Sequence, residues 1–507
     1  MKIEKHELIA VLSQFNPWWR GEHTTELPSW KRSAFHELLQ WVDEPPAPRA
    51  ILLSGARQIG KTTLLLQVIE ALLNKNISPA NILYATFDHP LLKMAGIDLV
   101  LEAWRERQPK GPGIEYLFLD EAQFIPHWGT WVKHQVDFFK NRRITFTGSA
   151  TPLIQTEPES GLGRWHNIQL ATLSFYEYLQ LIKQIEERKK LREKEYFNFM
   201  FREKPIDLYP TLSLPTLPHI KSIAELFDWS KDKFYEVTEL AAAYEGYFHQ
   251  YLIRGGFPQT AQVDSVKQAQ TLLREDIVDR ALKRDMTALF GVRRIFELEQ
   301  TFLYLCMHNG GLLSITNIAE NLPGANKPTI QKFIDLLEAT HLIYRIHPFG
   351  DGKQILRSKC KVYLADAAIA PAVLLKGESL LTDPIALGHA IEATVFKHLH
   401  VYYSSQHIRL TYFHGRKKDE IDIIAEENGE IIPYEIKYRY QHTGLRELKG
   451  LIELCNKRSI QRAYVITKSL DDFGLLINEK NPNLHIMRIP AALFCYWLGA
   501  LELCASS

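Results

Sequence analysis

The sequence lacks the long apolar stretches that membrane helices need. No run approaches the roughly 18 uninterrupted apolar residues of a membrane-spanning helix. The N-terminus, Met1-Lys-Ile-Glu-Lys-His, also lacks the apolar core of a signal peptide. We therefore expect a cytoplasmic protein that does not bind membranes.

The sequence also has few cysteines and almost no net charge. The 5 cysteines are scattered over 507 residues, and no pair has the close spacing of a metal site. The histidines show no metal-ligand spacing either. Lys and Arg number 60 against 59 Asp and Glu, so the net charge is +1 and no global field attracts nucleic acid. Any DNA binding must come from local patches, and the length predicts about two to four domains.

Short apolar runs alternate with helical patterns from about residue 50 to 170. The runs are Ala50–Ser54, Ile82–Phe87, Tyr116–Asp120, Ile144–Thr147 and Asn167–Leu170. This alternation is typical of a parallel sheet covered by helices, so we predict an α/β fold here.

A glycine-rich loop follows the first of these runs. The eight residues Gly55-Ala56-Arg57-Gln58-Ile59-Gly60-Lys61-Thr62 satisfy the pattern G-x-x-x-x-G-K-[ST] between a predicted strand and a predicted helix, and Thr63 follows them in the predicted site. Glycines let backbone N–H groups surround a phosphate, and Lys61 adds a point charge. The Thr62 hydroxyl can bind Mg²⁺. We predict that this loop binds ATP.

The run Tyr116–Asp120 ends in two adjacent carboxylates, Asp120 and Glu121. Behind a phosphate loop, Asp120 is placed to hold Mg²⁺ and Glu121 to polarise the attacking water. A strand end in a solvated turn is the alternative interpretation. Together the two motifs predict ATP hydrolysis as well as binding.

Two further residues are candidates for the ATP site. Ser149, with Thr147 behind it, ends the next apolar run and could sense the γ-phosphate; a polar turn is the alternative. Arg164 could stabilise charge on the phosphates, in cis or across a subunit interface, and a surface arginine is its alternative.

The last third of the chain predicts a hairpin that carries charged residues. Glu420 and Asp422 would share one face of a strand, and Glu435 and Lys437 one face of the next. Asn428-Gly429 between apolar runs is a strong hairpin signal.

Glu392, on a predicted helix upstream, can join this hairpin. Asp422 and Glu435 would supply oxygen ligands to Mg²⁺, and Lys437 would orient a water nucleophile. The spacing D-x(n)-(D/E)-x-K is typical of metal-dependent nucleases. A solvated charged face is the alternative.

Residues 295–365 have the order of a winged helix, with three helices and then two strands. The third helix, 327–341, would enter a DNA major groove. Lys327, Lys332 and the wing residues Arg357, Lys359 and Lys361 could contact phosphates. A packing module between domains is the alternative.

These motifs resemble prokaryotic ATPases of the AAA-like superfamily that carry a C-terminal domain of unknown function with a restriction-endonuclease-like fold. The resemblance rests on Asn16-Pro-Trp-Trp19, Gly55–Thr63, Leu119-Asp120-Glu121-Ala-Gln123, Thr147-Gly148-Ser149, Gly163-Arg164, Leu173–Tyr178, Gly255-Gly256-Phe257-Pro258, Tyr363–Asp366 and Glu392–Phe396. It implies that Glu392, Asp422, Glu435 and Lys437 are the nuclease-like residues. The charged segment 180–220 is longer than in that family.

We therefore predict an α/β multidomain protein with three parts. A P-loop NTPase parallel sheet with a helical lid would occupy 1–260, a winged helix 261–375, and a PD-(D/E)xK nuclease-like α/β domain 376–507. ATP and Mg²⁺ would be the cofactors. One hypothesis is that ATP controls Mg²⁺-dependent DNA cleavage, for example in defence; the other is an ATP-driven switch that binds a partner without cleaving it. A homo-oligomer is one possible arrangement, and a ring would fit if Arg164 acts in trans.

Overall fold

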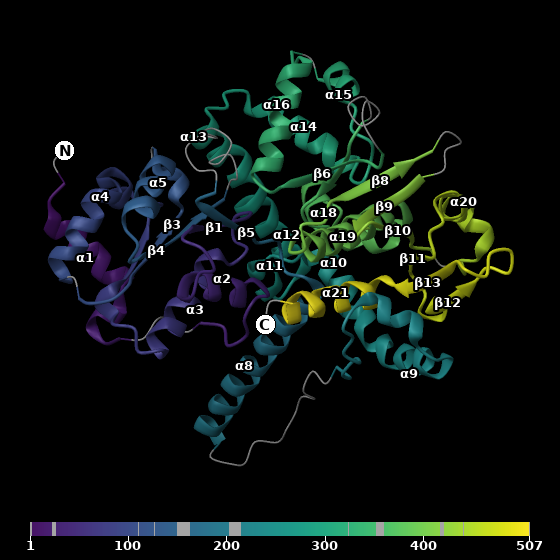
Figure 1. Ribbon diagram of the computed structural model, residues 1–507, viewed down its shortest axis with the longest axis horizontal. Helices are drawn as coiled ribbons and strands as arrows, with labels where there is room; N and C mark the ends of the chain where they lie inside the picture. Colours follow the sequence, from purple (N-terminus) through teal and green to yellow (C-terminus); the bar gives the residue numbers. More distant parts are fainter. Residues whose placement is uncertain are drawn as a thin grey trace.

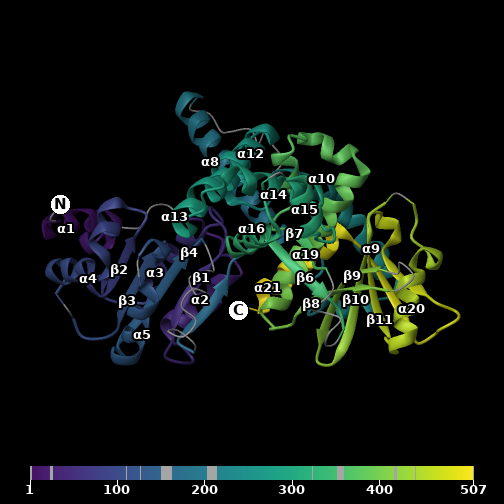
Figure 2. The same cartoon turned by 90° about the horizontal axis from the view of Figure 1, so that it is seen from above.

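The computed structural model describes residues 3–22, 27–109, 111–125, 127–149, 163–201, 214–322, 324–350, 359–415, 420–439 and 441–505, with only the backbone for 192–201. The chain runs from a sheet-containing lobe at its N-terminal end, through a helical middle, to a second sheet at its C-terminal end (Figures 1 and 2). Within these ranges, every helix is either too short or too polar to cross a bilayer.

The N-terminal lobe contains a sheet of five parallel strands, which confirms the predicted parallel sheet. The strands lie in the order β2-β3-β4-β1-β5. Their bounds are Ala50–Ser54 (β1), Ile82–Thr86 (β2), Glu115–Asp120 (β3), Arg142–Gly148 (β4) and Trp165–Gln169 (β5). β1 and β3 are buried along their whole length, as expected of strands covered on both faces.

Helices cover both faces of this sheet, because alternate strand residues point to opposite sides. Leu52 packs in one apolar cluster with α1 (Lys5–Phe15), α4 (Pro90–Arg107) and α5 (Trp128–Phe138). Leu53 packs in the other cluster with α2 (Ala34–Asp43) and α3 (Lys61–Asn74).

The turn that contains Asn16 binds the edge strand β2. The Asn16 side chain donates to the Tyr84 carbonyl and accepts from the Tyr84 amide, both at 2.8 Å. The indole nitrogens of Trp18 and Trp19 donate to the Ile82 carbonyl. The predicted Asn-Pro-Trp-Trp turn therefore closes part of the exposed edge of the sheet.

The middle of the chain is helical. Its elements are α8 (Phe175–Phe201), α9 (Lys231–Ala241), α10 (Glu245–Arg254), α11 (Pro258–Gln262), α12 (Val266–Leu272), a π-helical segment (Leu273–Asp285) and α13 (Met286–Phe290). The three helices and hairpin predicted for 295–365 follow as α14 (Ile295–Met307), α15 (Ile315–Asn321), α16 (Lys327–Ala339), β6 (Ile343–Pro348) and β7 (Lys361–Leu364). The winged-helix interpretation of these elements stays a prediction.

The hairpin β6–β7 differs from a free wing. β6 pairs in parallel with β8, so the hairpin forms one edge of an eight-stranded mixed sheet in the order β12-β13-β11-β10-β9-β8-β6-β7. The other strands are β8 (Leu410–His414), β9 (Glu420–Glu427), β10 (Glu430–Lys437), β11 (Arg462–Thr467), β12 (Gly474–Ile477) and β13 (His485–Pro490). This sheet continues across the boundary predicted at residue 375.

Four helices accompany the C-terminal sheet: α18 (Ile369–Val373), α19 (Pro384–Ser404), α20 (Lys449–Arg458) and α21 (Ala491–Ala505). The last of them, α21, packs against both α19 and α8 near the centre of the molecule (Figure 1). The end of the chain therefore joins the C-terminal sheet to the helical middle.

Candidate functional site

The phosphate loop connects β1 to α3, as predicted. Gly55 has φ +152°, and an added Cβ would lie 2.3 Å from the Leu170 carbonyl oxygen. Gly60 has φ +95°. Only glycine fits the first position, because the backbone of the segment after β5 lies directly against it.

Lys61 begins α3 and is buried at the mouth of the loop. Its ammonium group donates to the carbonyls of Gly55 at 2.9 Å and Ala56 at 2.7 Å. Burial lowers the Lys61 pKa, while the carboxylates of Glu121 and Asp120 act in the opposite direction. The structure thus places the lysine among both carboxylates of the second motif.

Thr62 and Asp120, the predicted Mg²⁺ ligands, are in direct contact. The Thr62 hydroxyl donates to Asp120 Oδ2 at 2.8 Å. Tyr84 on β2 donates to the same oxygen at 2.8 Å, and Thr147 on β4 donates to Oδ1. Strands β2, β3 and β4 therefore fix the Asp120 side chain, and two exchangeable oxygen ligands lie side by side, which fits Mg²⁺.

Glu121 and Ser149 are joined through Gln123. The Gln123 amide donates to Glu121 Oε2 and, at 3.0 Å, to the Ser149 hydroxyl. Glu121 has φ +56°, and its amide donates to the Thr147 hydroxyl at 2.9 Å. Burial raises the Glu121 pKa, which the Lys61 charge opposes. A carboxylate with a raised pKa beside the loop is suited to accept a proton from water.

Arg164 is not part of this group. It pairs with Asp137 at 2.8 Å, and its carbonyl accepts from the Ala50 amide, where β1 begins. The phosphate loop leaves the other end of β1, about 13 Å away at the usual rise per strand residue. A role for Arg164 in trans stays a prediction. Sequence reasoning gave no role to Tyr84 or Gln123. Only the fold brings Tyr84 to Asp120, whereas Gln123 stands two residues after Glu121 in the second motif.

The four predicted nuclease-like residues converge in the C-terminal part, where Glu420 of the predicted hairpin and Lys361, which was expected on the wing, join them. We use the name carboxylate–lysine cluster for Glu392, Glu420, Asp422, Glu435, Lys361 and Lys437. Lys361 on β7 lies 2.6 Å from Glu420, 3.4 Å from Glu392 and 3.5 Å from Asp422. Lys437 pairs with Glu435. Tyr363 donates to Glu392 at 2.7 Å.

Two carboxyl groups of the cluster have strongly raised pKa values. Burial, and then the charge of Asp422, raise the pKa of Glu392 to about 7 and that of Glu435 to about 8, against the opposing lysines. One Glu435 oxygen, Oε2, is buried and has no hydrogen-bond partner among the described residues. Burial and the repulsion from Asp422 therefore outweigh the attraction of the two lysines, and both groups hold a proton more readily than a free glutamate does.

The predicted Mg²⁺ ligands of the cluster, Asp422 and Glu435, have protein partners. Asp422 Oδ2 accepts from the Ile436 amide at 2.8 Å, and Glu435 Oε1 accepts from Lys437. The described part of the chain contains no group of three or more carboxylate, histidine or cysteine ligands arranged around a metal position. Mg²⁺ binding here stays a prediction.

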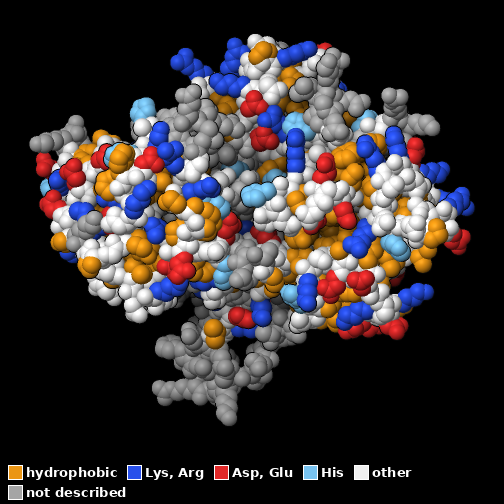
Figure 3. All heavy atoms as spheres, in the orientation of Figure 1, with side chains coloured by type: hydrophobic (Ala, Val, Ile, Leu, Met, Phe, Trp, Pro, Cys, Tyr) orange, Lys and Arg blue, Asp and Glu red, His pale blue; other side chains and the backbone are white. Residues whose placement is uncertain are grey.

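The expectation that Lys361 contacts DNA phosphates does not fit its position. The Lys361 side chain is 3% exposed, because β7 directs it onto the carboxylates of the carboxylate–lysine cluster. Lys359 is exposed beside it, whereas Arg357 lies outside the described residues. Basic and acidic side chains are mixed over most of the face in Figure 3.

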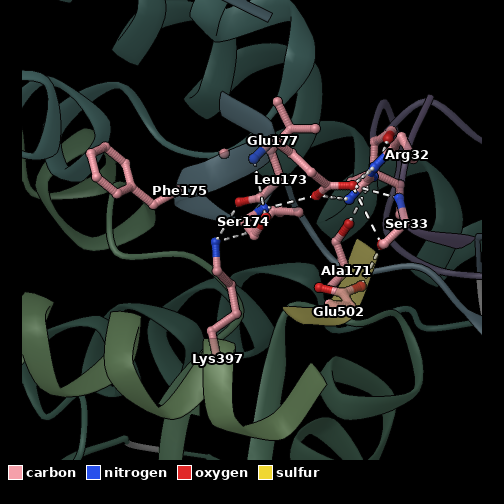
Figure 4. A network of polar contacts seen from close by, with 12 residues as sticks. Arg32, Ser33, Ala171, Leu173, Ser174, Phe175, Glu177, Lys397 and Glu502 are labelled. Atoms are coloured by element: carbon pink, nitrogen blue, oxygen red, sulfur yellow. Dashed lines mark hydrogen bonds and ion pairs between the residues drawn. The ribbon is translucent and has the colours of Figure 1, made fainter. Parts of the chain in front are cut away.

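A buried polar network links the phosphate loop to the C-terminal part (Figure 4). Arg32 donates to the Ile59 carbonyl in the loop at 2.8 Å and forms a two-pronged pair with Glu177 at 3.1 and 3.0 Å. Lys397 on α19 donates to the Leu173 carbonyl at 2.9 Å. Segment 171–177 therefore contacts both the loop and α19.

Comparisons with known proteins divide the chain into three parts. Residues 47–179 match a family model described as an AAA domain. Residues 245–380 and 387–491 match models described as domains of unknown function (DUF8612 and DUF4143). The AAA match contains the phosphate loop, Asp120, Glu121, Ser149 and Arg164, and the last match contains Glu392, Asp422, Glu435 and Lys437.

Two uncharacterized proteins are similar over much of the sequence. One, from Haemophilus influenzae, is 26% identical over 62% of this chain and 66% of its own length. The other, from Methanocaldococcus jannaschii, is 24% identical over 75% of each chain. The chain thus spans about two thirds of the first relative and three quarters of the second.

Solved structures with partial similarity include the two that follow. The Aeropyrum pernix ORC1 protein in complex with DNA covers 68% of this chain and 93% of its own, with 14% identity and a TM-score of 0.28. A RuvB variant from Thermotoga maritima covers 62% and 89%, with 18% identity and a TM-score of 0.28. Scores this low assign neither an overall architecture nor a function to this chain. The family match, the parallel sheet and the loop geometry identify its N-terminal part as an AAA-like P-loop ATPase domain.

Proposed function

We propose that this chain is an ATP-hydrolysing switch in which the ATP site controls the carboxylate–lysine cluster. The observation that carries the hydrolytic part is the contact between Thr62 and Asp120, with the half-buried Glu121 next to it in the chain. Binding alone needs only the loop and its lysine. The two carboxylates at the end of β3 supply the remaining parts of a hydrolytic site.

ATP would bind with its phosphates against the amides of Gly55–Gly60 and the ammonium of Lys61. Thr62 and Asp120 would hold Mg²⁺, which neutralises phosphate charge when bound. Glu121 would orient the attacking water and take its proton as the oxygen bonds to the γ-phosphorus and the bond to ADP breaks. Ser149, through Gln123, would keep the Glu121 carboxylate in place.

The pairing within the cluster favours a switch over cleavage. Lys361 lies among three carboxylates, and Lys437 pairs with Glu435. A cluster whose lysines already pair its carboxylates can change its contacts when α19 or β7 moves. In this function the C-terminal part binds a partner, with DNA one candidate, without cleaving it.

Mg²⁺-dependent cleavage of DNA is the second candidate, and an unpartnered carboxyl oxygen favours it. Four carboxyl groups face two lysines, and Glu435 Oε2 has no partner among the described residues. A divalent cation would favour the ionised carboxylates and activate a water nucleophile. Asp422 and Glu435 would hold it, and Lys437 would orient that water. A role in defence against foreign DNA belongs to this candidate.

ATP turnover with and without DNA tests the first proposal. We expect the wild type to release phosphate, and Glu121→Gln to lose about 10²–10⁴-fold in rate while it still binds ATP. Glu106→Gln, an exposed change on α4, is the matched control. Equal rates for the wild type and Glu121→Gln would refute the assigned hydrolytic role.

Plasmid cleavage with Mg²⁺ or Mn²⁺ separates the two candidates. Cleavage by the wild type that Glu435→Ala abolishes, with ATP turnover intact, would establish the nuclease. Absence of cleavage with every nucleotide, together with nucleotide-dependent binding of DNA, would support the switch.

A further inference from the structure

Arg57 lies inside the phosphate loop and forms a buried ion pair with a residue 228 positions away. Its Nε and Nη2 both bond to the Asp285 carboxylate, the latter at 2.6 Å. The side chains are 12% and 2% exposed. The third guanidinium nitrogen, Nη1, makes no hydrogen bond to any residue that the structure describes. Asp285 thus holds one edge of the guanidinium and leaves the other available.

Arg57 interacts electrostatically with the charged residues of the ATP site. Burial disfavours its charge, but Asp285 and then the more distant carboxylates of Glu121 and Asp88 outweigh this and raise the Arg57 pKa. In return, the Arg57 charge acts on both Lys61 and Glu121, lowering the pKa of each. Arg57 therefore belongs to the same electrostatic group as the lysine and the glutamate of the ATP site.

Asp285 comes from outside the AAA domain. It ends the π-helical segment Leu273–Asp285, in the part of the chain whose matched family model has no known function. The adjacent residue, Arg284, makes a separate exposed pair with Asp88 at 2.7 Å. The exposed Arg284–Asp88 pair contributes little to holding this helix on the ATPase domain, whereas Asp285 is buried and reaches the phosphate loop.

We propose that Arg57 is the arginine that stabilises phosphate charge during ATP hydrolysis, and that Asp285 is its positioning residue. This inference rests on the proposed ATPase function. It gives Arg57, in the same chain as the ATP site, the charge-stabilising role that was predicted for Arg164. Arg164 lies at the far end of β1. Arginine suits the task because its planar group binds a carboxylate along one edge and a phosphate along another.

Docking of the helical middle is therefore a condition for hydrolysis. If the π-helical segment moves away, Arg57 loses the carboxylate that fixes its guanidinium. The loop still has its amides and Lys61, so ATP binds but turns over slowly. The middle domain acts through this pair on the rate of hydrolysis rather than on affinity for ATP.

A double-mutant cycle on the full chain tests this inference. Arginines with this task contribute about 10³–10⁵-fold to the rate. We expect Arg57→Ala to lower kcat by at least about 100-fold, with a change in ATP Kd of less than about fivefold. Asp285→Asn should lower kcat by at least about tenfold, and Asp285→Glu should restore part of that loss.

The double variant Arg57→Ala/Asp285→Ala is the decisive measurement, and it also removes the buried unpaired charge that could impair folding. If Asp285 acts only through Arg57, the double variant will have the kcat of Arg57→Ala alone. Two results would overturn the inference. One is a double variant in which the kcat losses of the two single variants multiply, and the other is a kcat within twofold of wild type in Arg57→Ala.

Arg284→Ala is the matched control, because it breaks the neighbouring exposed pair on the same helix. It should keep the wild-type kcat within about twofold. Equal losses in Arg284→Ala and Asp285→Asn would show a role in docking alone and overturn the positioning role. If neither the wild type nor this control hydrolyses ATP, the proposed function itself fails.

Discussion

The substitution Glu435→Gln should make the protein more stable at alkaline pH. The folded structure raises the Glu435 pKa to about 8 from an ordinary value of 4.5, chiefly by burial. The folded state therefore holds its proton over a pH range in which the unfolded chain has lost it. The stability that this bound proton gives the folded state is fully present below the Glu435 pKa of the unfolded chain. It is lost as the pH rises through about 8, the pKa in the folded structure. Over this whole pH range, the rise in pKa corresponds to a loss of about 5 kcal/mol in the free energy of unfolding.

Urea unfolding at a series of pH values measures this effect. Near pH 5 the wild type and Glu435→Gln should have similar unfolding free energies. By about pH 8.5 the variant should be more stable by several kcal/mol, since glutamine keeps the neutral state and has no proton to lose. Glu430→Gln, at the exposed start of the same strand, should follow the wild type throughout. Parallel curves for the wild type and Glu435→Gln would refute the reasoning, because they would mean that Glu435 is ionised at neutral pH.

The same titration with Mg²⁺ but no nucleotide discriminates between the two proposed functions. If the cluster holds the cation, Mg²⁺ favours the ionised carboxylates, so it should stabilise the wild type increasingly as the pH rises. It should leave Glu435→Gln largely unaffected. A switch without a metal predicts no effect of Mg²⁺ on either curve.

Three other substitutions follow from the ATP site and the buried network. Glu177→Gln should lower the free energy of unfolding by about 3–5 kcal/mol in urea, because Arg32 is left buried without its partner charge; a loss below 1 kcal/mol would contradict this. Gly55→Ala should abolish binding of a fluorescent ATP analogue, since the new Cβ would lie 2.3 Å from a carbonyl oxygen; retained binding would show that the loop can shift. Tyr84→Phe should cost only about 1 kcal/mol in urea, because Asp120 keeps two threonine donors; a larger loss would mean that these donors do not compensate.

Local patterns were sufficient to predict many of the elements, including the glycine loop between β1 and α3. Strands covered on both faces are continuous apolar runs, so β1 and β3 could be located almost to the residue. The phosphate loop has a fixed spacing, and Asp120 ends a continuous apolar run. The position of β4 between this strand and β1 is seen only in the structure. The hairpin of β9 and β10 was predictable because its turn carries Asn428-Gly429.

Contacts between distant parts of the chain could not be predicted in this way. Lys361 was expected on an exposed wing, because the pattern of β7 does not reveal that its hairpin pairs with β8. The Arg57–Asp285 pair joins a loop to a helix 228 residues later, and each residue alone is an ordinary surface type. Arg164 lies next to a predicted turn, and only the strand order shows that this turn is at the wrong end of the sheet.

The structure gives the two candidate sites a common support in α19. Lys397 on this helix donates to the Leu173 carbonyl, four residues before the Glu177 that Arg32 holds, and Arg32 also donates to a carbonyl of the phosphate loop. Glu392 lies little more than one turn earlier on the same helix, in the carboxylate–lysine cluster. A helix is stiff over that distance, so a shift of segment 171–177 that carries Lys397 must also move Glu392 relative to β7. The contacts in the cluster are short and charged, and a small displacement changes their energies strongly. In the proposed switch, ATP hydrolysis would need to move only segment 171–177 to alter the charge balance at the C-terminal site.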